Sequence, residues 1–267
     1  MLKDITLGQY YPAESKIHHL DARVKLLAVL CYMFFLFLNN SAVGYGINIA
    51  VLAAIIKMTK IPPKQMIKGL KSVLFLLLFS VFFTVFFTKG ENMIFSIGII
   101  HISWQGIFMA VKICLRIFLL ILMSAILTLT TTPTDLADGM EKACAFLVKV
   151  KVPVHEIAMM ITIALRFIPV LTEETDKIMR AQKARGADFE SGGLIKKAKG
   201  LVPIFIPLIV SSVKRSSDLA LAMEARCYRG GEGRTKMKPL VYKKSDKIAY
   251  LVMAGYAIIM IIVKFVF

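Results

Sequence analysis

Apolar residues along this chain of 267 residues gather into five long runs that short polar stretches separate. The runs cover residues 24–38, 42–58, 73–88, 107–130 and 248–267. Each run approaches the ~20 residues that an α-helix needs to cross the hydrocarbon core of a bilayer. The pattern therefore predicts an all-α integral membrane protein with about five transmembrane helices.

Two further apolar stretches, 157–171 and 201–213, lie inside a long polar segment. The first contains Pro169, and the second contains Pro203 and Pro207. Because both are shorter than a usual membrane span, we interpret them as helices that lie at the membrane interface or are buried in protein. A topology of six or seven helices stays open, since short broken helices occur at membrane depth when protein covers them.

Basic residues are distributed unevenly among the loops, and this predicts the orientation. The loop at 89–106 carries only two charged residues, Lys89 and Glu91. The segment between the second and third runs, in contrast, has no acid and holds Lys57, Lys60, Lys64, Lys68 and Lys71. The positive-inside rule places this lysine segment and the N-terminus in the cytoplasm. We expect a multi-pass protein of the cell membrane whose N-terminus is cytoplasmic.

That orientation divides the chain into three parts. Residues 1–132 hold a cytoplasmic N-terminal lead and the first four transmembrane helices. Residues 133–247 form a cytoplasmic coupling domain with two motif-bearing helices, and residues 248–267 form the last transmembrane helix. The many lysines and arginines within 133–247 agree with a cytoplasmic location for that part.

Composition narrows the function classes. Hydrophobic residues make up 57% of the chain, and the formal net charge is +17. A nucleic-acid-binding protein would display such charge on a soluble fold, whereas here it lies between apolar runs, so we expect no nucleic-acid partner. The four cysteines form no CxxC pair and indicate neither a zinc site nor a disulfide framework: Cys31, Cys114, Cys144 and Cys227.

A weak internal repeat lies within the predicted cytoplasmic segment. Each copy starts with Phe-Ile-Pro and continues as a helical run that ends at an Ala-Arg pair. A guanidinium at a helix end can project beyond the helix and bind carboxylates or carbonyls of another protein. The alternative is that both are ordinary solvated basic helix ends. The two ends are Ala184-Arg185-Gly186 and Ala225-Arg226-Cys227.

No residue pattern predicts catalysis, a metal site or a cofactor. His155-Glu156 begins like the HExxH motif of zinc proteases, but Met159 stands where the second histidine ligand belongs. The GxxxxGK[ST] loop that cradles ATP phosphates does not occur in the sequence. We therefore expect a non-catalytic protein without a cofactor.

Two other polar groups leave alternatives open. Lys112 and Arg116 are neighbours on one face of the fourth run, where they either belong to a transport path or extend toward the membrane surface. His18, His19 and Asp21 either bind a metal or cap the start of the first helix.

Several stretches together resemble the transmembrane T component of energy-coupling factor (ECF) transporters, the vitamin and metal-ion importers of prokaryotes. The resemblance covers about residues 8–235. The chain departs from the family at Ala22, where proline is usual, and at Cys227, where glycine is frequent, and the second departure bears on turn geometry. The matching stretches are Ser15 to Leu27, Thr130 to Pro133, Ala164 to Pro169, Ala181 to Gly186 and Ala222 to Gly230.

The resemblance implies a scaffold that couples ATP hydrolysis by two ABC-type ATPases to movement of a substrate-binding membrane S component. Arg185 would bind one ATPase and Arg226 the other. An apolar platform on the coupling helices would carry the S component. A secondary transporter or channel subunit without ATPases is the alternative. The expected platform residues are Met159, Met160, Ile163, Phe167, Phe205 and Leu208.

Overall fold

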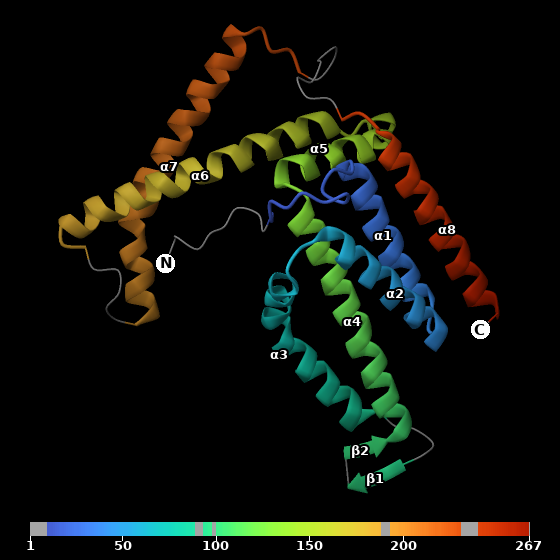
Figure 1. Cartoon of the computed structure of the whole chain (residues 1–267). Helices are drawn as coiled ribbons and strands as arrows, with labels where there is room; N and C mark the ends of the chain where they lie inside the picture. The colour runs from blue at the N-terminus through green and yellow to red at the C-terminus, as the bar shows by residue number, and fades with distance from the viewer. Residues whose placement is uncertain (1–9, 89–92, 98–99, 188–192, 231–239, 267) are drawn as a thin grey trace. The chain divides into compact units, whose positions relative to one another are not determined.

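Helices make up almost all of the structure, a computed structural model that describes residues 10–88, 93–97, 100–187, 193–230 and 240–266 (Figure 1). The predicted all-α membrane fold is confirmed, and each predicted run corresponds to a helix, apart from Thr88, which follows α3, and Phe267, which lies outside the described residues. One short hairpin joins α3 to α4 in a loop for which no strand was expected. The elements are α1 Ala22–Leu38, α2 Ala42–Thr59, α3 Pro63–Phe87, β1 Met93–Ile97, β2 Ile100–Ser103, α4 Trp104–Thr130, α5 Pro133–Ala143, the 3₁₀ helix η1 Cys144–Val150, α6 Val154–Ala184, α7 Leu194–Ala225 and α8 Lys244–Val266.

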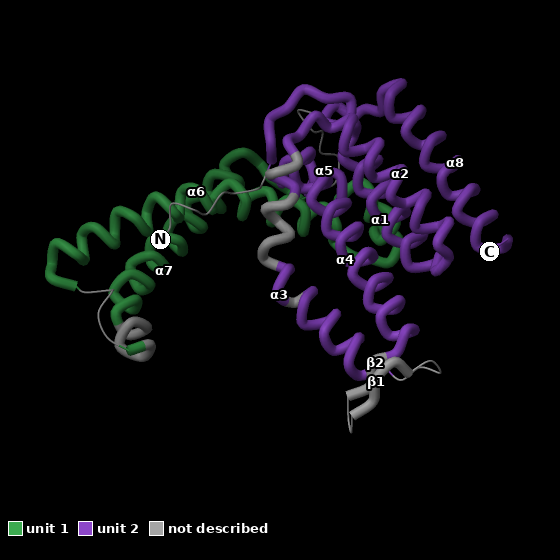
Figure 2. Tube along the Cα trace, turned by 60° about the horizontal axis from the view of Figure 1, so that its bottom comes forward, with its two compact units in different colours: residues 1–7, 141–239 green, residues 8–140, 240–267 purple. Residues whose placement is uncertain are grey.

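Contacts divide the chain into two compact units (Figure 2). Residues 8–140 and 240–267 form the first, which we call the bundle unit. Residues 1–7 and 141–239 form the second, which we call the crossed-helix unit. The three-part division at residues 132 and 247 stays a prediction.

Length and composition allow four of the described helices to cross a membrane, namely α2, α4, α6 and α8. Three of these are predicted spans. The other two predicted spans are shorter, because α1 has 17 residues and the apolar part of α3 covers Val73–Phe87. The expectation that the stretch 157–171 is too short for a span was wrong, because Pro169 does not interrupt a continuous helix of 31 residues.

The starts of α1 and α2 in the bundle unit are capped by side chains. The Asp21 carboxylate accepts from the Arg23 N–H at 2.9 Å at the start of α1. Ser41 accepts from the Gly44 N–H at 3.1 Å at the start of α2. A Cβ on Gly44 would lie 3.0 Å from the Asn39 Cβ, so a glycine allows the tight turn between α1 and α2.

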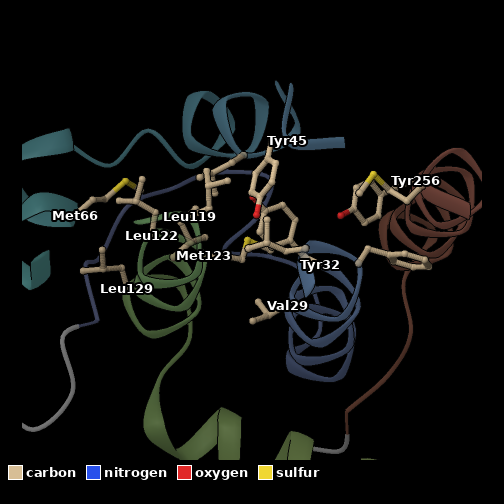
Figure 3. Packing of buried hydrophobic residues seen from close by; sticks show 14 of the residues in the cluster. Val29, Tyr32, Tyr45, Met66, Leu119, Leu122, Met123, Leu129 and Tyr256 are labelled. Atoms are coloured by element: carbon tan, nitrogen blue, oxygen red, sulfur yellow. The ribbon is translucent and has the colours of Figure 1, made fainter. Parts of the chain in front are cut away.

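Apolar side chains of α1, α2, α4 and α8 meet in one core in the bundle unit (Figure 3). A polar group lies within it: the Asn48 side-chain oxygen accepts from the Tyr256 hydroxyl at 2.7 Å, and the Asn48 carbonyl accepts from the Tyr32 hydroxyl at 3.2 Å. Tyr32 stacks on Tyr256 with ring centroids 6.2 Å apart. These bonds satisfy every one of the polar side chains involved, which is the condition for burying them in an apolar core.

A second polar cluster, which we call the polar clasp, joins three segments of the bundle unit. The buried Lys25 ammonium donates to the Thr130 carbonyl at 2.8 Å and to the His18 carbonyl at 3.0 Å. The buried Asp246 carboxylate accepts from the Asp21 N–H at 3.0 Å. The starts of α1 and α8 and the end of α4 are therefore held together by charge-assisted hydrogen bonds.

Asp21 itself is held in its charged form. Burial alone favours the neutral acid, but the hydrogen bonds and the positive charge of Arg23 outweigh burial, and the pKa of Asp21 is lowered. The Arg23 guanidinium lies 2.7 Å from the carboxylate and also donates to the Leu240 carbonyl at 3.3 Å. Arg23 thereby adds a contact between the start of α1 and the segment that leads into α8.

Candidate functional site

The end of α6 is a turn that closes on a glycine. Arg185 is the C-cap, and Gly186 follows it with a left-handed φ of 88°. The Gly186 N–H donates to the Lys183 carbonyl at 3.0 Å, and the Ala187 N–H donates to the Gln182 carbonyl at 3.0 Å. These two bonds define the Schellman motif, which satisfies the last carbonyls of a helix. Arg185 therefore lies at a sharply defined helix end.

The end of α7 repeats this geometry with a cysteine in place of the glycine. Arg226 is the C-cap, and Cys227 follows it with a left-handed φ of 56°. The Cys227 N–H donates to the Glu224 carbonyl at 2.9 Å, and the Tyr228 N–H donates to the Met223 carbonyl at 3.0 Å. The departure at Cys227 thus leaves the hydrogen-bond pattern of the turn unchanged.

Both arginines are exposed at these ends, as are the alanines before them, Ala184 and Ala225. Within the described residues, neither guanidinium has a hydrogen-bond or ion-pair partner. The turn bonds involve only backbone atoms, so the two side chains remain available to bind a partner. A guanidinium presents five donors in a planar fork, which suits carboxylates and backbone carbonyls.

Helices α6 and α7 pack against each other within the crossed-helix unit, where they cross (Figure 1). The Arg215 guanidinium of α7 lies 3.0 Å from the Glu174 carboxylate of α6. The Gln182 side chain of α6 donates to the Pro203 carbonyl of α7 at 3.4 Å. These contacts connect the last turns of α6 to the middle of α7.

The contact at Pro203 has a backbone cause. Pro207 has no N–H, so the carbonyl four residues earlier, that of Pro203, lacks its usual helical donor. Gln182 supplies a donor from the neighbouring helix. This explains how α7 continues through Pro207 and why α6 packs at this point.

One broad apolar strip on α7 is exposed. We call it the α7 strip. Its residues recur at spacings of three and four, as one helix face requires. Such a surface usually marks contact with a partner or a membrane. The strip consists of Leu201, Val202, Phe205, Ile206, Ile209, Val210 and Val213, each about half exposed or more.

The expected platform residues fall into two groups. Met160 and Phe205 are exposed at 58% and 61%. Met159, Ile163 and Phe167 are half-buried at successive i, i+4 positions of α6, and Leu208 of α7 is half-buried as well. Phe205 alone belongs to the α7 strip. The other residues of the α7 strip lie in the apolar stretch 201–213 that the sequence analysis identified, but they were not named among the expected platform residues.

The two cations of the fourth run bind the turn between α1 and α2. The Lys112 ammonium donates to the Asn40 carbonyl at 3.2 Å, and Arg116 donates to the Asn40 side chain. Arg116 also donates to the Tyr45 hydroxyl at 3.0 Å. These contacts fasten α4 to the neighbouring turn.

Two of the histidines considered as ligands, His18 and His155, have hydrogen-bond partners within the protein. His18 contacts the Ser15 hydroxyl at 2.7 Å and the Tyr11 carbonyl at 3.1 Å. His155 lies 2.9 Å from the Glu141 carboxylate. Over the part of the chain that the structure describes, no three His, Cys, Asp or Glu side chains gather as a metal site.

Comparison with known proteins identifies the class. The family model described as "Cobalt transport protein" matches residues 13–237. A relative from Acidaminococcus fermentans is 48% identical over 97% of each chain. One from Clostridium kluyveri is 50% identical over 94% of this chain and 93% of its own. One from Bacillus subtilis is 42% identical over 92% of this chain and 93% of its own.

Each of these three relatives is called "Energy-coupling factor transporter transmembrane protein EcfT". The helical membrane fold and these matches define a transmembrane component of a transporter. The chain belongs to the family of energy-coupling factor transporter transmembrane proteins. The resemblance of the sequence to this family is thereby confirmed, while the roles of the two Ala-Arg motifs stay a prediction.

The two left-handed turns predict opposite effects of substitution. Gly186→Ala places a side chain at a φ that costs about 1–2 kcal/mol, although no atom lies within 4 Å of the added Cβ. Cys227→Gly removes a similar cost. Hydrogen exchange of the last-turn amides should become roughly 5- to 30-fold faster in the first variant and slower in the second.

Gly193→Ala is the matched control. Gly193 also has nothing within 4 Å of the added Cβ, but its φ of −69° suits any residue. Its substitution should leave both helix ends unchanged. Equal exchange in Gly186→Ala and the wild type would show that the left-handed turn does not hold the end of α6.

Proposed function

We propose that this chain is the T-component scaffold of an ATP-driven importer for vitamins or metal ions. Two ABC-type ATPases bind it, one at Arg185 and the other at Arg226, and a substrate-binding S component rests on its apolar helix surfaces. The observation that carries the proposal is the pair of exposed arginines at two helix ends with the same left-handed turn.

Rigidity of the helix ends supports transmission of force. An arginine on a frayed end would move without moving its helix, whereas the Schellman bonds couple each arginine to the last turn. Helix α6 has 31 residues and α7 has 32, so each extends about 45 Å. Movement of an ATPase at one end is thereby carried along the length of the helix.

The contact between the two helices supports coupling. The Gln182–Pro203 hydrogen bond lies in the last turn of α6, beside Arg185, and the Glu174–Arg215 ion pair lies about three turns before the end of each helix. When ATP closes the two ATPases, both helix ends shift, and the crossing converts their shift into a change at the apolar surfaces. The S component reorients in response and releases its substrate.

The α7 strip and Met160 supply the platform in this proposal. Apolar surface of this extent needs a cover, and a small membrane protein fits it without leaving polar groups unpaired. Methionines such as Met159 and Met160 are flexible and repack against different shapes. They suit a scaffold that accepts more than one S component.

The cytoplasmic location of both arginines belongs to the same proposal, and one native cysteine tests it. Cys227 is exposed, whereas the other three cysteines are partly buried. A membrane-impermeant maleimide should label Cys227 in inside-out vesicles and leave it unlabelled in intact cells. Cys227→Ser should remove the signal. Labelling in intact cells would place Arg226 outside and overturn the proposal.

Charge reversal at both helix ends tests ATPase binding. Arg185→Glu with Arg226→Glu should reduce co-purification of the ATPases by at least about tenfold and abolish uptake. In the proposed complex each guanidinium is buried against an ATPase, and the substitution turns that attraction into a repulsion. The double variant should still enter the membrane, since both side chains are exposed.

Arg180→Glu with Lys214→Glu is the matched control. These exposed cations lie on the same two helices, away from the turns, and their reversal changes the net charge equally. The control should retain ATPase binding and uptake. Normal assembly of the Arg185/Arg226 variant with both ATPases would refute the assigned contacts.

Substitution in the α7 strip tests the platform. Ile206→Ser with Val210→Ser should weaken co-purification of the S component by about tenfold or more while ATPase binding persists, because both side chains are more than half exposed and offer apolar area. Leu221→Ser is the control, since Leu221 is 64% exposed on α7 but outside the strip. Loss of S component in the control alone would contradict the assignment.

A further inference from the structure

A basic cavity of about 460 Å³ lies in the bundle unit, whereas both Ala-Arg motifs belong to the crossed-helix unit. One wall is the segment that precedes α1, with Glu14, Lys16 and His19. The other wall is the end of α2 and the residue after it, with Lys57 and Lys60. Neither the proposed ATPase contacts nor the platform uses these residues.

The fold holds the first wall in place. The Tyr11 N–H donates to the Leu129 carbonyl at 2.9 Å, which attaches the N-terminal segment to the end of α4. His18 bridges the Tyr11 carbonyl at 3.1 Å and the buried Ser15 at 2.7 Å. The backbone that carries Lys16 and His19 is therefore folded back onto the bundle unit.

The second wall is shaped by the end of α2. Lys57 lies in the last turn of α2, and Lys60 is the C-cap with a left-handed φ of 55°. The left-handed residue turns the chain sharply at the cavity. Both lysines can therefore line one cavity although three positions separate them along the chain.

The cavity is strongly cationic. Its three lysines and one histidine face a single acid, Glu14. Among the residues that the structure describes, none of these three ammonium groups has an ion-pair or hydrogen-bond partner. Unpaired ammonium groups around one concave site attract an anion.

The position of the cavity indicates what kind of anion it would bind. It lies where the apolar residues of α2 end, and α2 is long and apolar enough to span a membrane. Met58, which is 49% exposed, adds an apolar wall beside Lys57. A cationic site with an apolar wall at a membrane boundary suits a molecule with a phosphate and a hydrocarbon body.

We propose that this cavity binds the headgroup of an anionic phospholipid, with Lys16, Lys57 and Lys60 around the phosphate and Met58 against the glycerol and acyl part. Its volume lies within the range of small-molecule sites, about 300–1,000 Å³. The site does not depend on ATPase coupling. It gives the N-terminal segment and α2 a shared lipid ligand.

The test titrates short-chain phosphatidylglycerol into the purified full-length protein in detergent, and native mass spectrometry measures the lipid-bound fraction. Lys16→Gln, Lys57→Gln and Lys60→Gln together should weaken binding by about a hundredfold, because each lysine near a lipid surface contributes roughly fivefold to the affinity. Replacing the same three lysines by arginine should preserve binding and shows that charge, not misfolding, causes the loss.

Lys243→Gln, Lys244→Gln and Lys247→Gln form the matched control. These exposed lysines belong to the same unit, but they do not line the cavity. Their substitution removes the same amount of positive charge as the first triple variant. Binding should weaken by less than about threefold, since their field is screened. An equal loss in both triple variants, or none in the first, would overturn the site.

Two further ligands, phosphatidylcholine and inorganic phosphate, test whether the bound anion is a lipid headgroup or a free anion. Phosphatidylcholine should bind far more weakly than phosphatidylglycerol, because it carries no net charge. Inorganic phosphate at millimolar concentration should compete only weakly, because it lacks the apolar body that Met58 contacts. Full displacement by inorganic phosphate would show that the cavity is a free-anion site and would contradict the lipid assignment.

Discussion

The buried ammonium of Lys25 is the constraint on which the bundle unit depends. It lies in the first turns of an apolar helix, where a charge without partners would be very costly. Carbonyls from the end of α4 and from the N-terminal segment satisfy it. Asp246 completes the polar clasp by accepting from the Asp21 backbone, so the first and last helices begin together. The N-terminal segment that the clasp holds also forms one wall of the basic cavity.

Periodicity and length predicted the positions of the helices, because apolar runs and their polar borders are local features. Continuity of α6 and α7 was not predictable in this way. A proline signals a break, and the donor that compensates Pro207 comes from Gln182 on another helix. The backbone of Cys227 shows a similar limit, since a cysteine seldom marks a left-handed turn. The Ala-Arg motifs were recognised by resemblance, and spacing alone left solvated helix ends as an alternative.

The two units differ in how much of their surface is buried and in the contacts between their helices. In the bundle unit, buried polar bonds fix the contacts between helices. In the crossed-helix unit, few side chains are buried, and much apolar surface on α7 remains exposed. A unit that is incomplete by itself suits a subunit whose surfaces are completed by others. In the proposed importer, the two arginine ends bind the ATPases and the α7 strip binds the S component, and all three belong to the crossed-helix unit.

The amide of Asn48 has a consequence for movement. The Asn48 side-chain oxygen accepts from the Tyr256 hydroxyl of α8, and the Asn48 backbone carbonyl accepts from the Tyr32 hydroxyl of α1. The side-chain nitrogen donates to the Gly44 carbonyl of the same helix. Sliding or rotating α8 by one turn would strand these groups in hydrocarbon, where water cannot replace the lost bonds. The hydrogen bonds of Asn48 therefore favour a single register of these three helices within the bundle unit.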